Sequence, residues 1–165
     1  MFAIQLALSS ITSYFLGSIP TAYLICKRKG IDIFNIGTGN PGAGNAFRKV
    51  GKKEGFLVFL VDCTKGYISL PIAIFIFQID NDWIILAGTF SIIGHLYSVF
   101  TKFKGGGGLA TLIGISLYLA PKAIFIGAIP SIILLLVIRD AVWSSIVGFI
   151  VAAITDLVLF QYPQI

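Results

Sequence analysis

The chain has 165 residues, of which 57% are hydrophobic and only 12% are charged, and its formal net charge is +5. Soluble domains carry about 25% charged residues, and a mean hydropathy of +0.96 leaves too few polar side chains to cover a globule. The composition therefore predicts an all-α, polytopic integral membrane bundle that forms a single domain over residues 1–165. Nucleic-acid binding, which a basic soluble chain would suggest, has no motif to support it.

Apolar segments recur along the chain and predict about six transmembrane helices. They cover roughly residues 3–25, 56–77, 83–100, 109–120, 122–138 and 142–160. The first has no basic start and no cleavage site, which favours a retained helix over a signal peptide. Pro121 and Lys122 divide the fourth from the fifth, so 109–138 is either a tight hairpin or one kinked helix. The hairpin is favoured because one helix over this range would be about 45 Å long.

Basic residues gather in alternate connections between these segments. They are Lys27, Arg28, Lys29, Arg48, Lys49, Lys52 and Lys53 after the first segment, Lys102 and Lys104 after the third, and Arg139 after the fifth. The opposite connections carry Asp80 and Asp82, with Lys122 as their lone basic residue. The positive-inside rule therefore predicts that the loops at about 27–54 and 101–108 are cytoplasmic and that both termini lie outside.

Two glycine-rich stretches lie on this basic face, GTGNPGAGNAFRKVGKK (37–53) and TKFKGGGGLAT (101–111). Glycine lets backbone N–H groups converge on an anion. Thr38, Asn40 and Asn45 add side-chain hydrogen-bond donors. Arg48 adds a planar guanidinium group whose N–H groups suit the oxygens of a phosphate. One interpretation is a pair of phosphate-binding loops, and the other is plain turns beside topology signals. Neither stretch has the P-loop pattern, so no nucleotide is inferred.

Charged and reactive residues within the apolar segments are few. Asp62 and Lys65 lie three positions apart on one helical face, which predicts an internal ion pair that braces a site. His95 stands at a helix end, where a lone histidine is more often a satisfied interface residue than a catalyst. Cys26 and Cys63 match no metal-ligand spacing, so they are interpreted as small apolar residues and no metal is predicted.

Three stretches together resemble one family. The run YFLGSIPTAYLICKRKGIDIFNIGTGNPGAGNAFRKVG (14–51) is similar to the start of the bacterial acyl-phosphate:glycerol-3-phosphate acyltransferases, the PlsY family, which show GSIP and then GSGNPGATNVLR. DCTKG (62–66) resembles the family's D-x-x-K-G, and GHLYSVFTKFKGGGGLAT (94–111) resembles GHxFPVFLKFKGGKGVAT. The resemblance runs in the same order from about residue 14 to residue 155.

The resemblance implies an activity and a site. The family moves a fatty acyl group from acyl phosphate to the 1-hydroxyl of glycerol 3-phosphate, which gives lysophosphatidic acid for phospholipid synthesis. It does so at the cytoplasmic face of the bacterial inner membrane, without a cofactor or metal. Carried over to this chain, the catalytic residues would be His95, Arg48 and Thr38, and substrate phosphate would be bound by Gly39, Asn40, Gly42, Asn45, Lys104, Gly105 and Gly106.

Departures from the family pattern define an alternative. Thr38 replaces a serine and keeps its hydroxyl, but Gly107 stands where GGKG has a lysine expected to bind phosphate. Losing one charge-assisted contact removes about 1.5–3 kcal/mol, unless Lys102 or Lys104 substitutes. The printed sequence stops at FQYPQI, so we also expect it to lack the family's seventh helix and C-terminal histidine, asparagine and glutamate. The alternative is thus a degenerate or truncated relative that binds phosphate-bearing lipid without turnover.

Overall fold

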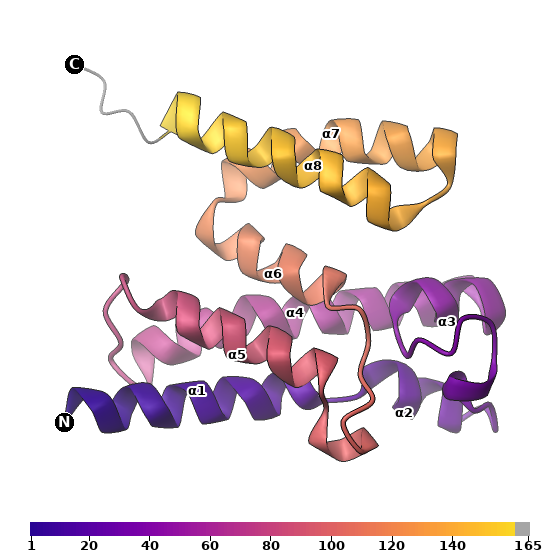
Figure 1. The fold of residues 1–165 in the computed structure, drawn as a ribbon, viewed down its shortest axis with the longest axis horizontal. Coiled ribbons are helices and arrows are strands. Elements are labelled where there is room, and N and C mark those ends of the chain that lie inside the picture. The colour runs from indigo at the N-terminus through magenta and orange to yellow at the C-terminus, as the bar shows by residue number, and fades with distance from the viewer. Residues whose placement is uncertain (161–165) are drawn as a thin grey trace. The chain divides into compact units, whose positions relative to one another are not determined.

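The computed structural model describes residues 1–160, and every regular element in that range is helical (Figure 1). The chain divides into two compact units, with the boundary after Ile115. The first contains α1 (Phe2–Ser18), α2 (Thr21–Lys27), η1 (Ile33–Asn35), α3 (Ala43–Lys49), α4 (Lys52–Phe75), α5 (Ile84–Leu96), η2 (Val99–Thr101) and the start of α6 (Leu109–Leu119). The second contains the end of α6, then α7 (Pro121–Ile138), α8 (Ala141–Thr155) and the π-helical turn η3 (Asp156–Phe160).

The predicted membrane helices are largely confirmed. Stretches long and apolar enough to cross a membrane are Phe2–Lys27, Lys52–Phe75, Ile84–Thr101, Pro121–Ile138 and Ala141–Leu159. The remaining predicted segment is α6, whose 11 residues rise about 16 Å, roughly half of the hydrocarbon thickness. Ala120 is non-helical, with φ −140° and ψ 63°, and separates α6 from α7. Residues 109–138 are therefore two helices, and the first is too short for an upright span.

The first membrane stretch is broken between α1 and α2. Proline has no N–H and cannot continue the helical ladder, and here Pro20 follows Ile19, whose φ of −54° and ψ of 113° are not helical. The Thr21 N–H donates to the Ile19 carbonyl over 3.0 Å. The break therefore interrupts the helical hydrogen-bond ladder between Ser18 and Thr21, while the side chains of these two residues stay buried.

Small residues bring the helices of the first unit into backbone contact. A Cβ at Gly17 of α1 would overlap the Ser91 carbonyl of α5, and a Cβ at Gly94 of α5 would overlap the Tyr14 carbonyl of α1. Lipid tails are as apolar as leucine, so membrane helices associate through close packing rather than through the hydrophobic effect. These glycines therefore fix α1 against α5, the pair that carries much of the site described below.

The second unit uses the same packing between α7 and α8. A Cβ at Gly127 would overlap the Gly148 carbonyl, and a Cβ at Gly148 would lie 2.8 Å from the Cβ of Ser131. Asp140 caps α8, because its carboxylate accepts the N–H groups of Val142 and Trp143 over 2.9 and 3.0 Å. The two helices therefore form a closely packed antiparallel pair with a capped start.

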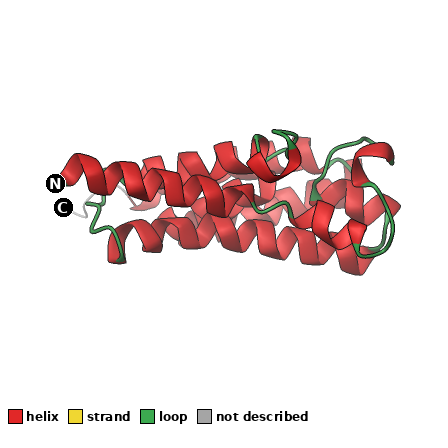
Figure 2. Ribbon diagram, turned by 90° about the horizontal axis from the view of Figure 1, so that it is seen from below, coloured by secondary structure: helices red, strands yellow, loops and turns green. Residues whose placement is uncertain are grey.

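Both glycine-rich stretches lie at the same end of the first unit. Figure 1 shows the 28–51 connection where α2 finishes and α4 begins and the 97–108 connection beside the break between α1 and α2, both in the half of the unit away from the N-terminus, while the 76–83 connection lies at the end that carries the N-terminus. The view in Figure 2 places the N-terminus in the same way, opposite the longer loops. Within the first unit, the basic connections are thus grouped away from the connection that carries Asp80 and Asp82, in agreement with the charge pattern.

Candidate active site

A small apolar core supports the first glycine loop, which lies within residues 37–53. Cys26, Ile33, Ala46 and Val58 are all fully buried and pack together, which joins α2, η1, α3 and α4. Both cysteines have free thiols. No group of three or more potential ligands that could hold a metal ion occurs in the described part of the chain. The core residues thus give the loop an apolar base.

Asn45 holds the first loop from the inside. Its Oδ1 accepts the Thr38 N–H over 3.2 Å, and its Nδ2 donates to the carbonyls of Ile36, over 3.0 Å, and Ile33, over 3.4 Å. Only 3% of Asn45 is exposed, so this geometry makes it a support of the loop backbone. Gly37 and Gly39 have φ of +57° and +68°, a conformation that glycine adopts without steric cost.

The other predicted residues of this loop are more open. Thr38, Asn40 and Arg48 are exposed, and the Thr38 hydroxyl accepts the Asn40 N–H over 3.4 Å. The Arg48 guanidinium lies over Gly44, since its Nη1 is 3.5 Å from where a Gly44 Cβ would be. Gly42 is the extended residue that precedes α3. The loop thus presents a hydroxyl, an amide and a guanidinium at its surface.

The second glycine loop is pressed against the end of α5. A Cβ at Gly105 would overlap the carbonyl oxygens of His95 and Leu96, and a Cβ at Gly106 would overlap Nε2 of His95. The Gly106 N–H donates to the His95 carbonyl over 3.1 Å, and the Thr101 hydroxyl donates to the Lys104 carbonyl over 2.7 Å. Glycine is required at 105 and 106 because the backbone at the end of α5 and the His95 ring occupy the space that a side chain would need.

A small cleft lies where these parts meet. It is lined by Ser18, Ile19, Pro20, Thr21, Pro41, His95, Ser98, Thr101, Lys104, Gly105 and Gly106. The structure therefore brings together four of the predicted site residues, His95, Lys104, Gly105 and Gly106. From the first loop only Pro41 lines the cleft, while Thr38, Gly39, Asn40, Gly42, Asn45 and Arg48 lie outside its lining.

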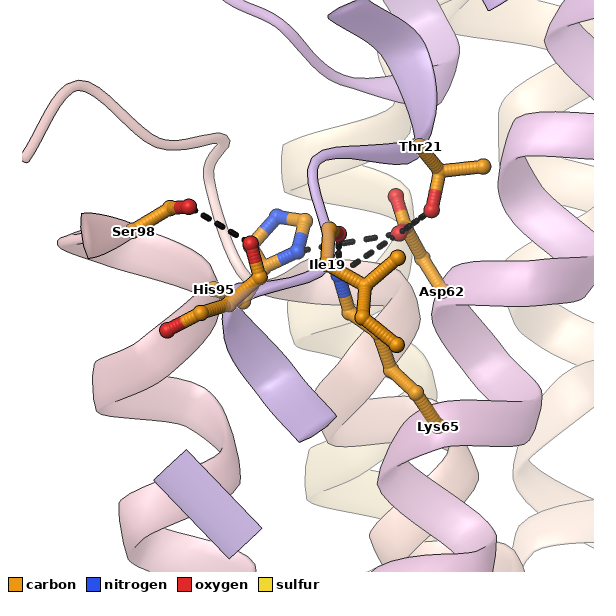
Figure 3. A network of polar contacts seen from close by, with 7 residues as sticks. Ile19, Thr21, Asp62, Lys65, His95 and Ser98 are labelled. Carbon is orange, nitrogen blue, oxygen red and sulfur yellow. Dashed lines mark hydrogen bonds and ion pairs between the residues drawn. The ribbon is translucent and has the colours of Figure 1, made fainter. Parts of the chain in front are cut away.

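A buried ion pair stands behind the cleft (Figure 3). Lys65 Nζ lies 2.8 Å from Asp62 Oδ1, and the two side chains are 4% and 2% exposed, which confirms the predicted pair. The Lys65 ammonium also donates to the Ile19 carbonyl over 2.9 Å, and the Thr21 hydroxyl donates to Asp62 Oδ1 over 2.9 Å. The pair thus ties α4 to the break between α1 and α2.

His95 joins this network from α5. Its Nδ1 lies 3.8 Å from Asp62 Oδ1, and Figure 3 shows the imidazole turned toward that carboxylate. One turn later, the Ser98 hydroxyl donates to the Ser18 carbonyl over 2.5 Å. The sequence analysis assigned no role to Thr21 or Ser98. Two features could have indicated these residues: the proline after α1, which lies next to Thr21, and the one-turn spacing from His95 to Ser98.

Gly107 lies where the two loops face each other. It is exposed, and a Cβ built on it would lie 3.5 Å from Asn40 Nδ2. That distance is an ordinary van der Waals contact, so the backbone at 107 would accept a side chain. The position at which the resembling family has lysine is therefore opposite Asn40 and open.

These features define a multi-pass membrane protein whose first unit contains a small cleft lined in part by His95 and Lys104. A family model described as glycerol-3-phosphate acyltransferase matches residues 7–165. The glycerol-3-phosphate acyltransferase of Trichlorobacter lovleyi is 42% identical over 156 residues, which are 92% of this chain and 76% of that one. The corresponding protein of Geobacter metallireducens is 46% identical over 114 residues.

Solved structures agree with the family match. The crystal structure of PlsY, an integral membrane glycerol 3-phosphate acyltransferase, in its glycerol 3-phosphate form is 38% identical, with a TM-score of 0.85. That comparison covers 96% of this chain and 78% of the PlsY chain, whereas the Geobacter match covers 69% of this chain and 58% of the relative. The chain belongs to the glycerol-3-phosphate acyltransferase family.

Proposed function

We propose that this protein transfers a fatty acyl group from acyl phosphate to the 1-hydroxyl of glycerol 3-phosphate and so makes lysophosphatidic acid. The observation that carries the proposal is the cleft in which His95 and Lys104 meet the glycines at 105 and 106. The related PlsY has been crystallised in glycerol 3-phosphate and lysophosphatidic acid forms, which are the acceptor and the product of this reaction.

The chemistry follows from the charges of the two substrates. Both carry phosphate, so a cationic site must offset their repulsion as well as hold them. Lys104 lines the cleft and Arg48 stands exposed beside the first loop. The acyl phosphate is already activated, so positioning and stabilisation of developing charge supply most of the catalysis and a covalent enzyme intermediate is not needed.

The reacting groups can be assigned around His95. The glycerol 3-phosphate 1-hydroxyl attacks the acyl carbon, the bond from that carbon to the phosphate oxygen breaks, and inorganic phosphate leaves. The hydroxyl proton passes to a base, and we assign this role to His95 Nε2; the position of this nitrogen beside Gly106 in the cleft supports the assignment. A positioned imidazole contributes typically 10²–10⁴-fold to such a step.

We place this reaction at the cytoplasmic face of the bacterial inner membrane. The basic residues between 27 and 53 and those at 102 and 104 share the end of the first unit that carries the glycine loops. Positive charge marks the cytoplasmic side of a membrane protein. The proposed substrates, a water-soluble glycerol phosphate and a lipid-soluble acyl phosphate, would meet at this surface.

The test is turnover by the purified protein in lipid. Palmitoyl phosphate and glycerol 3-phosphate are supplied, and both phosphate release and lysophosphatidic acid are followed, with His95→Ala as the matched inactive variant. Phosphate and lysophosphatidic acid should appear in equal amounts, and only with the parent protein. Binding of either substrate without turnover would instead support the degenerate relative, which Gly107 favours.

Arg48→Ala should lower kcat/KM for glycerol 3-phosphate by roughly ten- to a hundredfold, as expected for one lost charge-assisted contact of about 1.5–3 kcal/mol. Arg48→Lys should recover only part of the loss, because lysine keeps the charge but not the planar fork. Arg28→Ala is the control, since Arg28 is an exposed cation of the same connection outside the glycine loop. Equal kinetics for the Arg48 and Arg28 variants would remove Arg48 from the site.

Gly107→Lys should raise kcat/KM by about ten- to a hundredfold, because it adds a phosphate-binding ammonium. The Cβ at 107 meets only Asn40 Nδ2, at ordinary contact distance, so the folded structure should be unchanged. Gly107→Ala is the control for the added side chain and should match the parent. The same assay measures all three proteins; no gain with lysine would mean that another cation already fills this role.

A further inference from the structure

The turn that joins α5 to the second glycine loop is closed by its own hydrogen bonds. The Phe103 N–H donates to the Ser98 carbonyl over 2.8 Å, and the Lys104 N–H donates to the Thr101 carbonyl over 3.1 Å. Lys102 and Phe103 both have a left-handed backbone, with φ of 53° and 61°. Residues with long or bulky side chains rarely adopt this conformation, because the Cβ crowds the backbone. The turn therefore holds two consecutive residues in an unfavourable conformation.

This conformation leaves aromatic side chains at the surface of the unit. Phe100 and Phe103 are 58% and 61% exposed, and Lys102, which lies between them in the sequence, is exposed as well. The sequence has no acidic residue from Ile84 to Gly108. Backbone strain is retained where a function needs it, and exposed apolar side chains that lie together mark a binding surface. Two rings beside a cation fit a partner that is apolar and carries negative charge.

The rings of this turn continue the lipid-facing side of α1. Exposed apolar residues recur every three or four positions along that helix, namely Ile4, Leu8, Ile11 and Phe15. Such spacing places them in one stripe, and an exposed apolar stripe on a membrane-spanning helix faces lipid. The centroid of the Phe15 ring lies 6.3 Å from that of Phe100. The turn is thus packed against the last residue of a lipid-facing stripe, which identifies lipid as the material that covers it.

The length of α1 gives the depth of the turn in the membrane. Its 17 residues rise about 26 Å, close to the hydrocarbon thickness of about 30 Å. At its start, the rings of Phe2 and Trp83 pair edge to face at 5.9 Å, and such aromatic residues are typical of a membrane interface. At its end, the Ser18 carbonyl accepts the Ser98 hydroxyl and ties the turn to this level. The turn therefore lies at the opposite boundary, where hydrocarbon meets headgroups.

We infer that Phe100, Lys102 and Phe103 form a surface anchor that binds the outermost layer of the bilayer. The two rings lie among the upper ends of the acyl chains, and the Lys102 ammonium binds the headgroup of an anionic phospholipid. Thr101 and Lys104 of the same turn line the cleft. The surface anchor thus holds the second glycine loop level with the membrane surface, and this role does not depend on the reaction proposed above.

A single tryptophan placed in the turn tests the depth of the surface anchor. Trp83 and Trp143 are the chain's two tryptophans, so their replacement by phenylalanine makes Phe103→Trp the only indole. The full chain is held in vesicles of phosphatidylcholine and phosphatidylglycerol, with bromine either near the headgroup or near the methyl end of the acyl chains. The shallow bromine should quench the emission at least about twofold, as expected for a ring at the interface. The deep bromine and aqueous iodide should quench it less.

Arg28→Trp in the same background is the control for a position in water. Arg28 is exposed at the end of α2, whose 7 residues rise about 10 Å past the break. Iodide should quench this indole and brominated lipid should not. Phe100→Trp is a second reporter in the turn, should behave like Phe103→Trp, and serves if that variant does not fold. Quenching of the turn reporters by iodide alone, or most strongly by the deep bromine, would overturn the inference.

The role of Lys102 is tested by brominating one headgroup class at a time. At equal content, brominated phosphatidylglycerol should quench the Phe103→Trp reporter more than brominated phosphatidylcholine, with a local enrichment of up to about fivefold for one lysine near the surface. Lys102→Gln should remove most of this preference. Lys49→Gln is the matched control, because Lys49 is an exposed cation of the first glycine loop, and it should leave the preference unchanged.

Equal quenching by the two lipids, or a preference that survives Lys102→Gln, would also contradict the surface anchor. None of these measurements needs turnover. A protein with the expected quenching and no acyltransferase activity would therefore keep the surface anchor and lose the proposed function. Activity without lipid quenching would have the opposite meaning.

Discussion

Gly105→Ala should lower turnover by at least about a hundredfold, which is the cost of displacing a reacting group by about 1 Å. The added Cβ would overlap the carbonyl oxygens of His95 and Leu96, and these are backbone atoms that cannot rotate away. The second loop must therefore move off the end of α5, and the spacing between Lys104 and His95 changes with it. Forced packing of this kind also costs about 1–3 kcal/mol of stability.

Gly107→Ala, two residues away, is the matched control for this substitution. It adds the same methyl group where the only close atom is Asn40 Nδ2, at 3.5 Å. Turnover and thermal unfolding of the two variants in the same lipid separate a steric effect from a general loss of loop flexibility. Similar behaviour of both variants would mean that the close approach of the loop to α5 does not set the site.

Lys65→Met should destabilise the folded protein by about 3–5 kcal/mol, the usual cost of removing one partner of a buried ion pair. Methionine fills most of the lysine volume, so the effect reports charge rather than a cavity. The Asp62 carboxylate would stay buried with only the Thr21 hydroxyl at hydrogen-bond distance. The Ile19 carbonyl would lose its side-chain donor as well.

The exposed pair between Lys29 and Glu54 provides the comparison for the buried one. Lys29→Met should leave the unfolding transition unchanged within error, because solvent screens exposed ion pairs. The double variant Asp62→Asn with Lys65→Met should be less destabilised than Lys65→Met alone, since no unpaired charge remains. Unfolding curves in one detergent measure all of these proteins, and equal effects of the two lysine substitutions would contradict the assignment.

The sequence predicted those parts of the molecule that depend on local pattern. Apolar runs located the spans, and a spacing of three placed Asp62 and Lys65 on one face of α4. The bounds of α6 were also close to the predicted segment at about 109–120, but the prediction counted this segment among the transmembrane helices, and its 11 residues are too few for an upright span. Only Pro121 indicated the division.

Only part of the predicted site comes together in the cleft, because the predicted residues of the first loop lie outside its lining. The second loop and His95 meet in the cleft as the motifs implied. The sequence did not show which groups Asn45 binds. An asparagine side chain can bind a ligand or the backbone of its own loop with the same polar groups, and the path of the backbone determines which of the two it reaches. The hydrogen bonds of Thr21 and Ser98 reach partners that are 41 and 80 positions away in the sequence, respectively. No local sequence pattern can therefore predict them.

The bond between Lys65 and the Ile19 carbonyl sets an order of events during biosynthesis. Its partners are 46 residues apart, and at 5–20 residues per second a ribosome needs about 2–9 s to make that length. During this interval the first segment is already emerging, and the lysine that gives the Ile19 carbonyl its side-chain donor does not yet exist. The bond between Lys65 and Ile19 therefore forms only after α4 has joined the first segment, and the cleft is complete only when α5 and the second glycine loop have followed.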